Sequence, residues 1–209
     1  RVKILPERYA KSYLDWLGEK RDWPVSRQLW WGHQIPVWLK KTSSAEDHDT
    51  TLAKVKSQFA NSSEVTFTTE LNTEFQPGSD VPYGWVHVCI QQENSPFESQ
   101  AEQLGFIREA DVLDTWFSSA LWPHSTFGWP EQTPELAYWY PTSVLITSRD
   151  IITLWVARMV LTGLNNMHEI PFHEVFIHPK ILDGYGETMS KSKGNGVDPL
   201  DVIEKFGAD

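Results

Sequence analysis

Apolar residues at helical spacing mark two segments of the chain. Tyr9, Tyr13, Trp16 and Leu17 fall on one face of a 3.6-residue period. Pro6 is acceptable in a first helical turn, so a helix is predicted over residues 6–20. A second helix is predicted from about Asp150, and Gly163 and Asn165–Asn166 are expected to end it. Its apolar face comprises Ile152, Trp155, Val156, Met159 and Val160.

Two short apolar runs flank this second helix. Val144–Thr147 precedes it and Glu174–His178 follows it, and both are predicted as strands buried in a parallel sheet. Strand, helix and strand make a βαβ pattern, which implies a right-handed crossover. A glycine-rich loop is predicted over residues 183–196, and Asp198 is predicted to cap a helix that begins at Pro199. The fold class that follows is α/β.

The stretch from Lys40 to Gln103 is richer in polar residues than the rest of the chain. A short helix is predicted over Leu52–Phe59, and alternation predicts strands over Glu64–Thr69 and Trp85–Gln91. We interpret residues 40–103 as a small inserted subdomain with little chemical signal. Residues 1–39 and 104–209 then form the two parts of the main domain.

Composition excludes several classes of protein. Hydrophobic residues make up 40% and charged residues 22% of the 209 residues, as in ordinary globular proteins. No apolar run reaches the roughly 18 residues of a membrane span, so no membrane segment is expected. The net charge of −10 argues against this chain supplying most of a grip on a nucleic-acid backbone. The single cysteine, Cys89, excludes a disulfide framework and fits a reducing, cytoplasmic setting.

The strongest local signal is the loop Thr188-Met-Ser-Lys-Ser-Lys-Gly-Asn195, which follows a predicted strand. Lysine charges on a mobile loop can neutralise phosphate charge as it develops, and hydroxyls and backbone N–H groups add donors. Composition alone leaves a second interpretation open, because short runs of lysine and serine are common on solvated surfaces.

This loop resembles the KMSKS signature of the class I aminoacyl-tRNA synthetases. The resemblance implies a Rossmann-like nucleotide-binding fold, here a partial parallel sheet, and a loop that binds ATP and stabilises the transition state of amino-acid adenylation. It assigns Lys191, Ser190 and Ser192 to catalysis, and Met189 with Lys191 to ATP binding. Thr188 stands where the signature has its first lysine, which removes one positive charge; Lys193 is a candidate to compensate.

Two further strings point to the valyl branch of this family. Asp22-Trp-Pro-Val-Ser-Arg-Gln-Leu-Trp-Trp-Gly-His-Gln-Ile-Pro-Val-Trp38 resembles the segment in which the chain returns from the editing domain to the catalytic domain. Asp111-Val-Leu-Asp-Thr-Trp-Phe-Ser-Ser-Ala-Leu-Trp-Pro123 resembles the valyl enzymes almost letter for letter. In the family its tryptophan lines the valine pocket, which implies that role for Trp116. The alternative is that Trp116 belongs to the core.

A fourth signal, Thr147-Ser-Arg-Asp150, joins a predicted strand to a predicted helix. Nucleotides bind at the carboxyl edge of parallel sheets, and a carboxylate there can accept both ribose hydroxyls. The resemblance assigns Asp150 to the ribose, Ile151 to the valine side chain and His178 to the adenine. Asp150 as a helix cap and His178 as a locally bonded strand end are the alternatives. Ser148 replaces a glycine of the family pattern.

The parent reaction implied is ATP-dependent activation of valine to valyl-adenylate, followed by transfer to tRNA(Val), with Mg²⁺ accompanying ATP. We expect no zinc, because only Cys89 remains where relatives often carry a cysteine-rich knuckle. The HIGH signature of the first catalytic half, the editing domain and the anticodon-binding domain are absent, so this chain alone is expected to be inactive. Two alternatives stay open: a non-catalytic module that binds nucleotide or a partner, and an isoleucyl relative.

Overall fold

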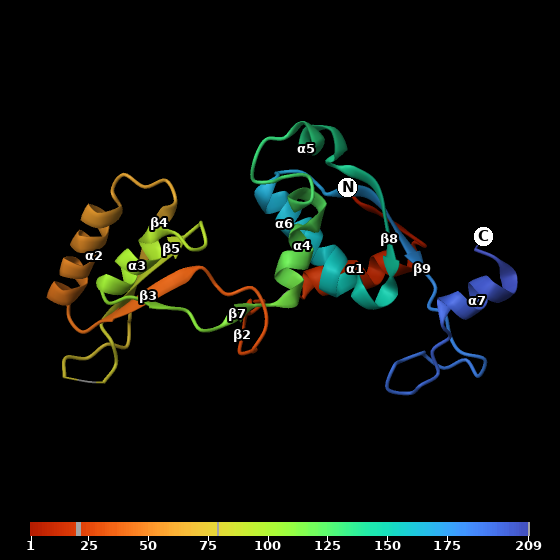
Figure 1. The fold of residues 1–209 in the computed structure, drawn as a ribbon, viewed down its shortest axis with the longest axis horizontal. Helices are drawn as coiled ribbons and strands as arrows, with labels where there is room; N and C mark the ends of the chain where they lie inside the picture. The colour runs from red at the N-terminus through yellow and green to blue at the C-terminus, as the bar shows by residue number, and fades with distance from the viewer. Residues whose placement is uncertain (20–21, 79, 209) are drawn as a thin grey trace. The chain divides into compact units, whose positions relative to one another are not determined.

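A computed structural model describes residues 1–19, 22–78 and 80–208, and Figure 1 traces them. The chain divides into two compact units. The first unit comprises Arg1–Trp23 and Trp116–Asp209, and the second comprises Pro24–Thr115. The expected insert of residues 40–103 therefore lies inside a unit that begins earlier and ends later in the chain. Each unit is described separately below.

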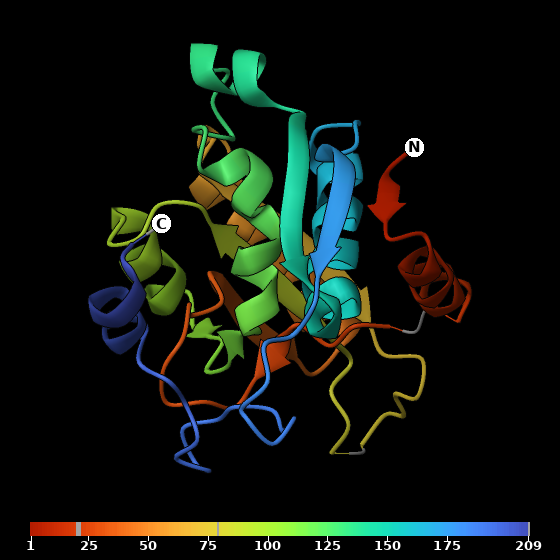
Figure 2. The ribbon, with the colours of Figure 1, turned by 90° about the vertical axis from the view of Figure 1, so that its right-hand side faces the viewer.

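The first unit is built on a parallel three-stranded sheet. Its strands are β1 (Lys3–Leu5), β8 (Thr142–Ser148) and β9 (Phe172–His178), in the order β1-β9-β8. Both pairings are parallel, with Leu5 opposite Phe176 and Ser148 opposite His178. The predicted βαβ unit and the α/β class are confirmed, and β8 and β9 lie side by side in Figure 2. Strand β1 has only three residues, too few to produce an alternating pattern.

Five α-helices accompany this sheet: α1 (Arg8–Gly18), α4 (Thr115–Ser125), α5 (Pro134–Trp139), α6 (Ala157–Asn166) and α7 (Pro199–Phe206). The helix predicted over 6–20 is confirmed as α1, while Lys20, its expected last residue, lies outside the described residues. The predicted cap of the last helix is also confirmed, because the Asp198 carboxylate accepts a hydrogen bond from the Leu200 amide at 2.9 Å.

The helix predicted from Asp150 begins differently from expectation. A 3-10 turn over Arg149–Ile151 leads into a π-helical turn over Ile152–Val156, and only then does α6 begin. Turns of π-helix are rare and often occur at functional sites. Gly163 does not end the helix but lies within it. A Cβ at this position would come 2.7 Å from the hydroxyl oxygen of Tyr140, which favours glycine there.

One face of the sheet carries the core of the first unit. Leu145, Val175 and Ile177 are buried against residues of α1, the π-helical turn and α6. The prediction that both strands are buried on both faces is wrong for this chain. Val144, Ile146 and Phe176 are 49%, 64% and 45% exposed. Alternate residues of a strand point to opposite faces, and the core cluster gathers on only one of them.

Helix α4 packs against the π-helical turn and α6 through polar edges of large side chains. The indole N–H of Trp155 donates to the Ser119 carbonyl at 2.9 Å, and the Thr162 hydroxyl donates to the Ala120 carbonyl at 2.7 Å. The rings of Trp122 and Trp155 lie 5.7 Å apart. The bond from Trp155 satisfies its indole N–H, so these tryptophans fit a half-buried interface.

The second unit contains an antiparallel sheet in the order β4-β5-β3-β6. Its strands are β3 (Val37–Thr42), β4 (Val65–Leu71), β5 (Gly84–Ile90) and β6 (Ile107–Arg108); β2 (Ser26–Arg27) pairs separately with β7 (Val112–Leu113). Two helices, α2 (Ala45–Phe59) and α3 (Pro96–Gln103), contribute to a core around Trp38. The strands predicted near 64–69 and 85–91 are confirmed as β4 and β5.

Helix α2 is two turns longer than the helix predicted over Leu52–Phe59. Its start is specified by a reciprocal cap rather than by apolar spacing. The Ser44 hydroxyl accepts from the Asp47 amide at 3.1 Å, and the Asp47 carboxylate accepts from the Ser43 amide at 2.9 Å. Such caps satisfy orphan backbone donors of the first turn. Among the described residues, no helix is long and apolar enough to cross a membrane.

His124 is buried in the first unit, where aromatic rings pack against its imidazole. It is fully buried, lies 5.0 Å from the ring of Trp129, and its Nε2 is 3.1 Å from the Asn166 side-chain nitrogen. Burial lowers the pKa of His124 below its ordinary value because desolvation penalises the charged imidazolium.

We therefore expect folding to weaken as pH falls. Above the unfolded-state pKa of about 6.5, His124 is neutral in both states and its contribution is fully present; below it, protonation favours the unfolded chain. Urea unfolding at pH 7.5 and 5.5 should give a smaller loss of stability in His124→Phe than in the wild type. Equal losses in the two proteins would contradict this role of His124.

Candidate functional site

Two predicted site residues lie at the carboxyl ends of neighbouring parallel strands. Asp150 follows β8 in the 3-10 turn, and His178 is the last residue of β9. Ser148 and His178 are register partners, so the two strands end at the same level. This edge of the sheet, with the residues that directly follow both strands, is called the rim below. In open α/β sheets it is the edge at which ligands bind.

The Asp150 carboxylate is held between two cations. Lys180 Nζ lies 2.8 Å from Oδ2, and Arg149 Nε lies 3.6 Å from Oδ1. The hydrogen bond from Lys180 is the main reason that the pKa of Asp150 lies below its ordinary value, and the charges of Lys180 and Arg149 add to it. The carboxylate is thus ionised at neutral pH. These cationic partners, rather than backbone amides, argue against the alternative that Asp150 caps its helix.

Lys180 and Arg149 were not among the predicted site residues. Each of these residues comes two positions after a predicted strand, and that position was the feature of the sequence that could have identified it. Lys180 comes two residues after β9 and reaches across to the end of β8, so one ion pair ties the two strand ends together. The carboxylate side chain stays 45% exposed and keeps lone pairs for further donors.

His178 makes the local contact that the alternative interpretation anticipated. Its Nδ1 is 2.8 Å from the carbonyl oxygen of Pro179, and the side chain is exposed. Since only a protonated Nδ1 can donate to that carbonyl, the neutral ring presents Nε2 as an acceptor. The local bond and a role beside an adenine base are compatible, because they use different ring nitrogens.

The loop that carries the lysines is folded by its own side chains. The Asn195 amide donates to the Asp183 carboxylate at 2.7 Å and accepts from the Ser190 backbone amide at 3.0 Å. Gly186 and Gly194 have φ of +79° and +63°, a region that favours glycine, so the loop turns sharply at both positions. Leu182 and Thr188 form an isolated antiparallel bridge across its base.

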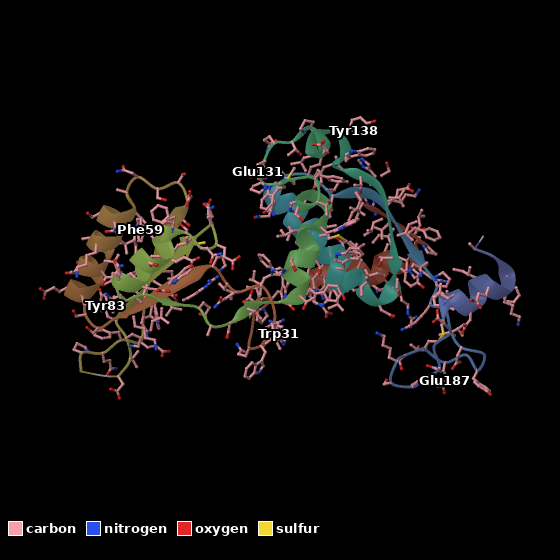
Figure 3. The ribbon with its side chains drawn as sticks, in the orientation of Figure 1. Trp31, Phe59, Tyr83, Glu131, Tyr138 and Glu187 are labelled. Carbon is pink, nitrogen blue, oxygen red and sulfur yellow. The ribbon has the colours of Figure 1, made fainter. Side chains whose placement is uncertain are left out.

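The two lysines of the loop have different surroundings. Lys193 Nζ is 3.0 Å from Glu187 Oε2, and Figure 3 labels Glu187 on this loop. Lys191 is exposed, and within the described part of the chain its ammonium has no recorded ion pair. Ser190 and Ser192 place their hydroxyl oxygens 3.2 Å apart. Of the two ammonium groups, that of Lys193 is thus paired with a carboxylate, while that of Lys191 is left for an anionic ligand.

Trp116 and Ile151 are both half-buried and lie on elements that pack together. Trp116 is in the first turn of α4, and Ile151 ends the 3-10 turn. The Thr162 hydroxyl donates to the Ala120 carbonyl, and the Asn166 side chain lies 3.1 Å from His124 Nε2. Positions four residues apart on α4 thus meet positions four residues apart on α6, so the two helices run in the same direction. We infer that Trp116 and Ile151 both lie toward the rim end of these helices.

The described residues hold no metal-binding cluster, and a groove of the first unit lies away from the predicted site residues. No group of three or more His, Cys, Asp or Glu side chains among them is placed to hold a metal ion. A groove of about 570 Å³ lies between β1 and α1, lined by Ile4, Leu5, Ala10 and Tyr13 among others, and none of the predicted site residues lines it.

Comparison with known proteins identifies what the chain resembles. The family description "tRNA synthetases class I (I, L, M and V)" matches residues 1–209. The chain is 60% identical over 209 residues to the valine–tRNA ligase of Rhodopirellula baltica, and 44% identical over 208 residues to that of Clostridium tetani. Both matches extend over the whole of this chain, but over only 20% and 19% of the length of those relatives.

Solved structures with low sequence identity share the fold. A Mycobacterium tuberculosis methionyl-tRNA synthetase in complex with methionyl-adenylate matches with a TM-score of 0.56 at 18% identity, covering 98% of this chain and 27% of that one. A ternary complex of an Agrobacterium radiobacter LeuRS, tRNA and LeuAMS matches with a TM-score of 0.51 at 20% identity, covering 90% and 23%.

The Lys180–Asp150 contact has a direct test that does not depend on activity. In Lys180→Gln, the pKa of the Asp150 carboxyl should rise toward its ordinary value, because the main hydrogen bond and a nearby charge are lost. A ¹³C NMR titration of the Asp150 carboxyl measures it. Arg149→Gln is the matched control and should produce a smaller rise. An unchanged pKa in Lys180→Gln would contradict the pairing.

Proposed function

Because the chain belongs to the class I tRNA synthetases (I, L, M and V), we propose that it is the second half of the catalytic domain of a valine–tRNA ligase. The chain spans about a fifth of the length of the relatives that it matches, so the activity belongs to the longer protein. That protein uses ATP, with its accompanying Mg²⁺, to convert valine to valyl-adenylate and then transfers valine to tRNA(Val).

The observation that supports this proposal most strongly is the composition of the rim. An ionised carboxylate follows β8, and the lysine loop follows β9, its register neighbour. A nucleotide substrate needs both kinds of group: an acceptor for its ribose hydroxyls and a cation for its phosphates. The identity of 60% to a valine–tRNA ligase supports valine as the amino acid.

The proposed reaction needs no protein nucleophile. A carboxylate oxygen of valine attacks the α-phosphorus of ATP, and pyrophosphate leaves with the electron pair of the broken P–O bond. In this proposal Asp150 orients the ribose and His178 lies beside the adenine. Positioning and charge stabilisation are sufficient for an in-line displacement of this kind.

Charge stabilisation is assigned to the lysine loop. Lys191 neutralises the negative charge that develops on the phosphates, and the hydroxyls of Ser190 and Ser192 with the Met189 backbone complete the ATP contacts. Lys193 contributes less than its position suggests, since Glu187 neutralises it at 3.0 Å. Thr188 supplies no charge, so Lys191 carries most of this task.

Selection of the amino acid is assigned to Trp116 and Ile151. A rigid indole wall and a branched aliphatic side chain suit a small branched apolar ligand. Such a pocket separates valine from isoleucine by shape, because an extra methylene is worth about 1–3 kcal/mol. The longer protein should therefore activate valine in preference to isoleucine by roughly 10- to 200-fold in kcat/KM.

The decisive test is valine-dependent exchange between ATP and pyrophosphate in the full-length protein. Lys191→Ala should lower kcat by about 10²- to 10³-fold, the usual effect of removing one group that stabilises transition-state charge. Lys193→Ala is the matched control, and we expect a change of less than about tenfold because its charge is already paired.

Three results would contradict the proposal. A folded full-length protein without exchange favours a non-catalytic module, for which the departures at Thr188 and Ser148 are the sequence argument. Faster exchange with isoleucine than with valine favours an isoleucyl relative. Equal losses in Lys191→Ala and Lys193→Ala would remove the distinction between the two lysines.

A further inference from the structure

Asp183 and Asn195 lie at opposite ends of the loop that carries Lys191 and hold those ends together. The Asn195 side-chain nitrogen is 2.7 Å from Asp183 Oδ2, a contact between residues that are 12 positions apart. Neither residue was assigned a role by the motifs or by the proposed function. Their arrangement is more specific than a single surface hydrogen bond, because each side chain also binds the loop backbone.

Asp183 collects three donors from the loop. In addition to the Asn195 amide, its Oδ1 accepts from the backbone amides of Tyr185 at 3.0 Å and Glu187 at 2.8 Å. Its own amide donates to the Glu187 carbonyl at 2.9 Å. The hydrogen bond from Asn195, followed by that from the Glu187 amide, lowers the pKa of Asp183, so the carboxylate is ionised at neutral pH.

Asn195 connects this carboxylate to the residue that precedes Lys191. Its Oδ1 accepts from the Ser190 amide at 3.0 Å while its nitrogen donates to Asp183. Only a side chain with a donor and an acceptor can make both bonds at once. Ser190 also anchors the following turn, since its carbonyl and its hydroxyl each accept from the Lys193 amide at 3.2 Å.

The consequence for Lys191 follows from chain connectivity. The turn closes on the residue itself, because the Gly194 amide donates to the Lys191 carbonyl at 3.3 Å. A turn fixed at Ser190, Lys191 and Asn195 leaves the Lys191 backbone little freedom, while its side chain stays exposed. A charge that must meet developing phosphate charge is more effective when it is ordered in advance.

We propose that Asp183 and Asn195 form a positioning clasp for the adenylation step, holding the backbone on both sides of Lys191 so that its ammonium meets the phosphates. The proposal rests on the proposed function. Neither residue of the clasp touches the substrate; the pair acts through Lys191. Its effect should therefore appear in the rate of the step that Lys191 serves rather than in the binding of valine.

The chemistry of the clasp suggests a substitution that breaks it and a second that repairs it. Asn195→Asp sets two carboxylates against each other at the 2.7 Å contact, where like charges repel and a donor is missing. Adding Asp183→Asn exchanges the two side chains. The amide at 183 can then donate to the carboxylate at 195, accept from Tyr185 and Glu187, and leave the second carboxylate oxygen for the Ser190 amide.

Exchange kinetics of the full-length protein test the positioning role. Asn195→Asp should lower kcat by about 10- to 100-fold, the effect of losing hydrogen bonds to a charged group, with KM for valine within about twofold of the wild type. The double variant should recover kcat to within about threefold. Asp198→Asn is the control for the Asp183→Asn half of the double variant, because it also converts an aspartate of this segment to asparagine yet keeps a side chain that caps α7.

Hydrogen exchange of the Tyr185, Glu187 and Ser190 amides separates a failure of the clasp from a failure of the proposed function. The single variant should lose protection at these amides and the double variant should regain it. Regained protection without regained kcat would overturn the positioning role, as would an unchanged kcat in an unprotected single variant. If the wild type shows no valine-dependent exchange between ATP and pyrophosphate, the proposed function and the positioning role both fail. Protection of the three amides from hydrogen exchange then decides whether the clasp exists.

Discussion

The register between two parallel strands is the constraint on which the candidate site depends. Because Ser148 and His178 are opposite each other, β8 and β9 end at one level, and whatever follows either strand emerges at the same edge. Asp150 follows one strand, and Lys180 and the lysine loop follow the other. A shift of the pairing would separate them along the strand direction by about 3.3 Å per residue, enough to break the 2.8 Å contact of Lys180 with Asp150.

Several positive charges lie near this edge, although the chain as a whole is acidic. The chain carries a net charge of −10, yet Arg149, Lys180, Lys191 and Lys193 all occur between the end of β8 and the end of the loop. Three of these cations are paired with carboxylates in the described structure: Arg149 and Lys180 with Asp150, and Lys193 with Glu187. Pairing holds most of the charges in place and leaves Lys191 for an anionic ligand, which is an arrangement suited to positioning more than to general attraction.

The sequence predicted best where one physical signal dominated. Apolar periodicity located α1 and the body of α6, and the Asp198-Pro199 pair located the start of α7. The prediction failed where a different interaction determined the local structure. Periodicity missed the polar first turns of α2, which the reciprocal bonds of Ser44 and Asp47 specify, and it gave no sign of the π-helical turn. An apolar run such as Val144–Thr147 indicates a strand, but burial depends on what covers each face, so the 64% exposure of Ile146 was not foreseen.

The candidate site shows the same division. Motifs named Asp150, Lys191 and Trp116, because residue identity at fixed spacing is visible in a sequence. They assigned no role to Lys180, Asp183 or Asn195, whose importance lies in contacts across 30 and 12 positions of the chain. Such contacts depend on how a loop folds back on itself, and only coordinates provide that information.

In the proposed function, Asp150, Lys191 and Trp116 bind one ligand. A crystal structure of the full-length protein with a non-hydrolysable valyl-adenylate analogue tests it most directly. We expect the ribose hydroxyls on the Asp150 carboxylate, the Lys191 ammonium within hydrogen-bond distance of the phosphate or its substitute, and the valine side chain against the Trp116 indole. A bound analogue that leaves any two of these side chains without contact would show that the three residues do not form one binding site.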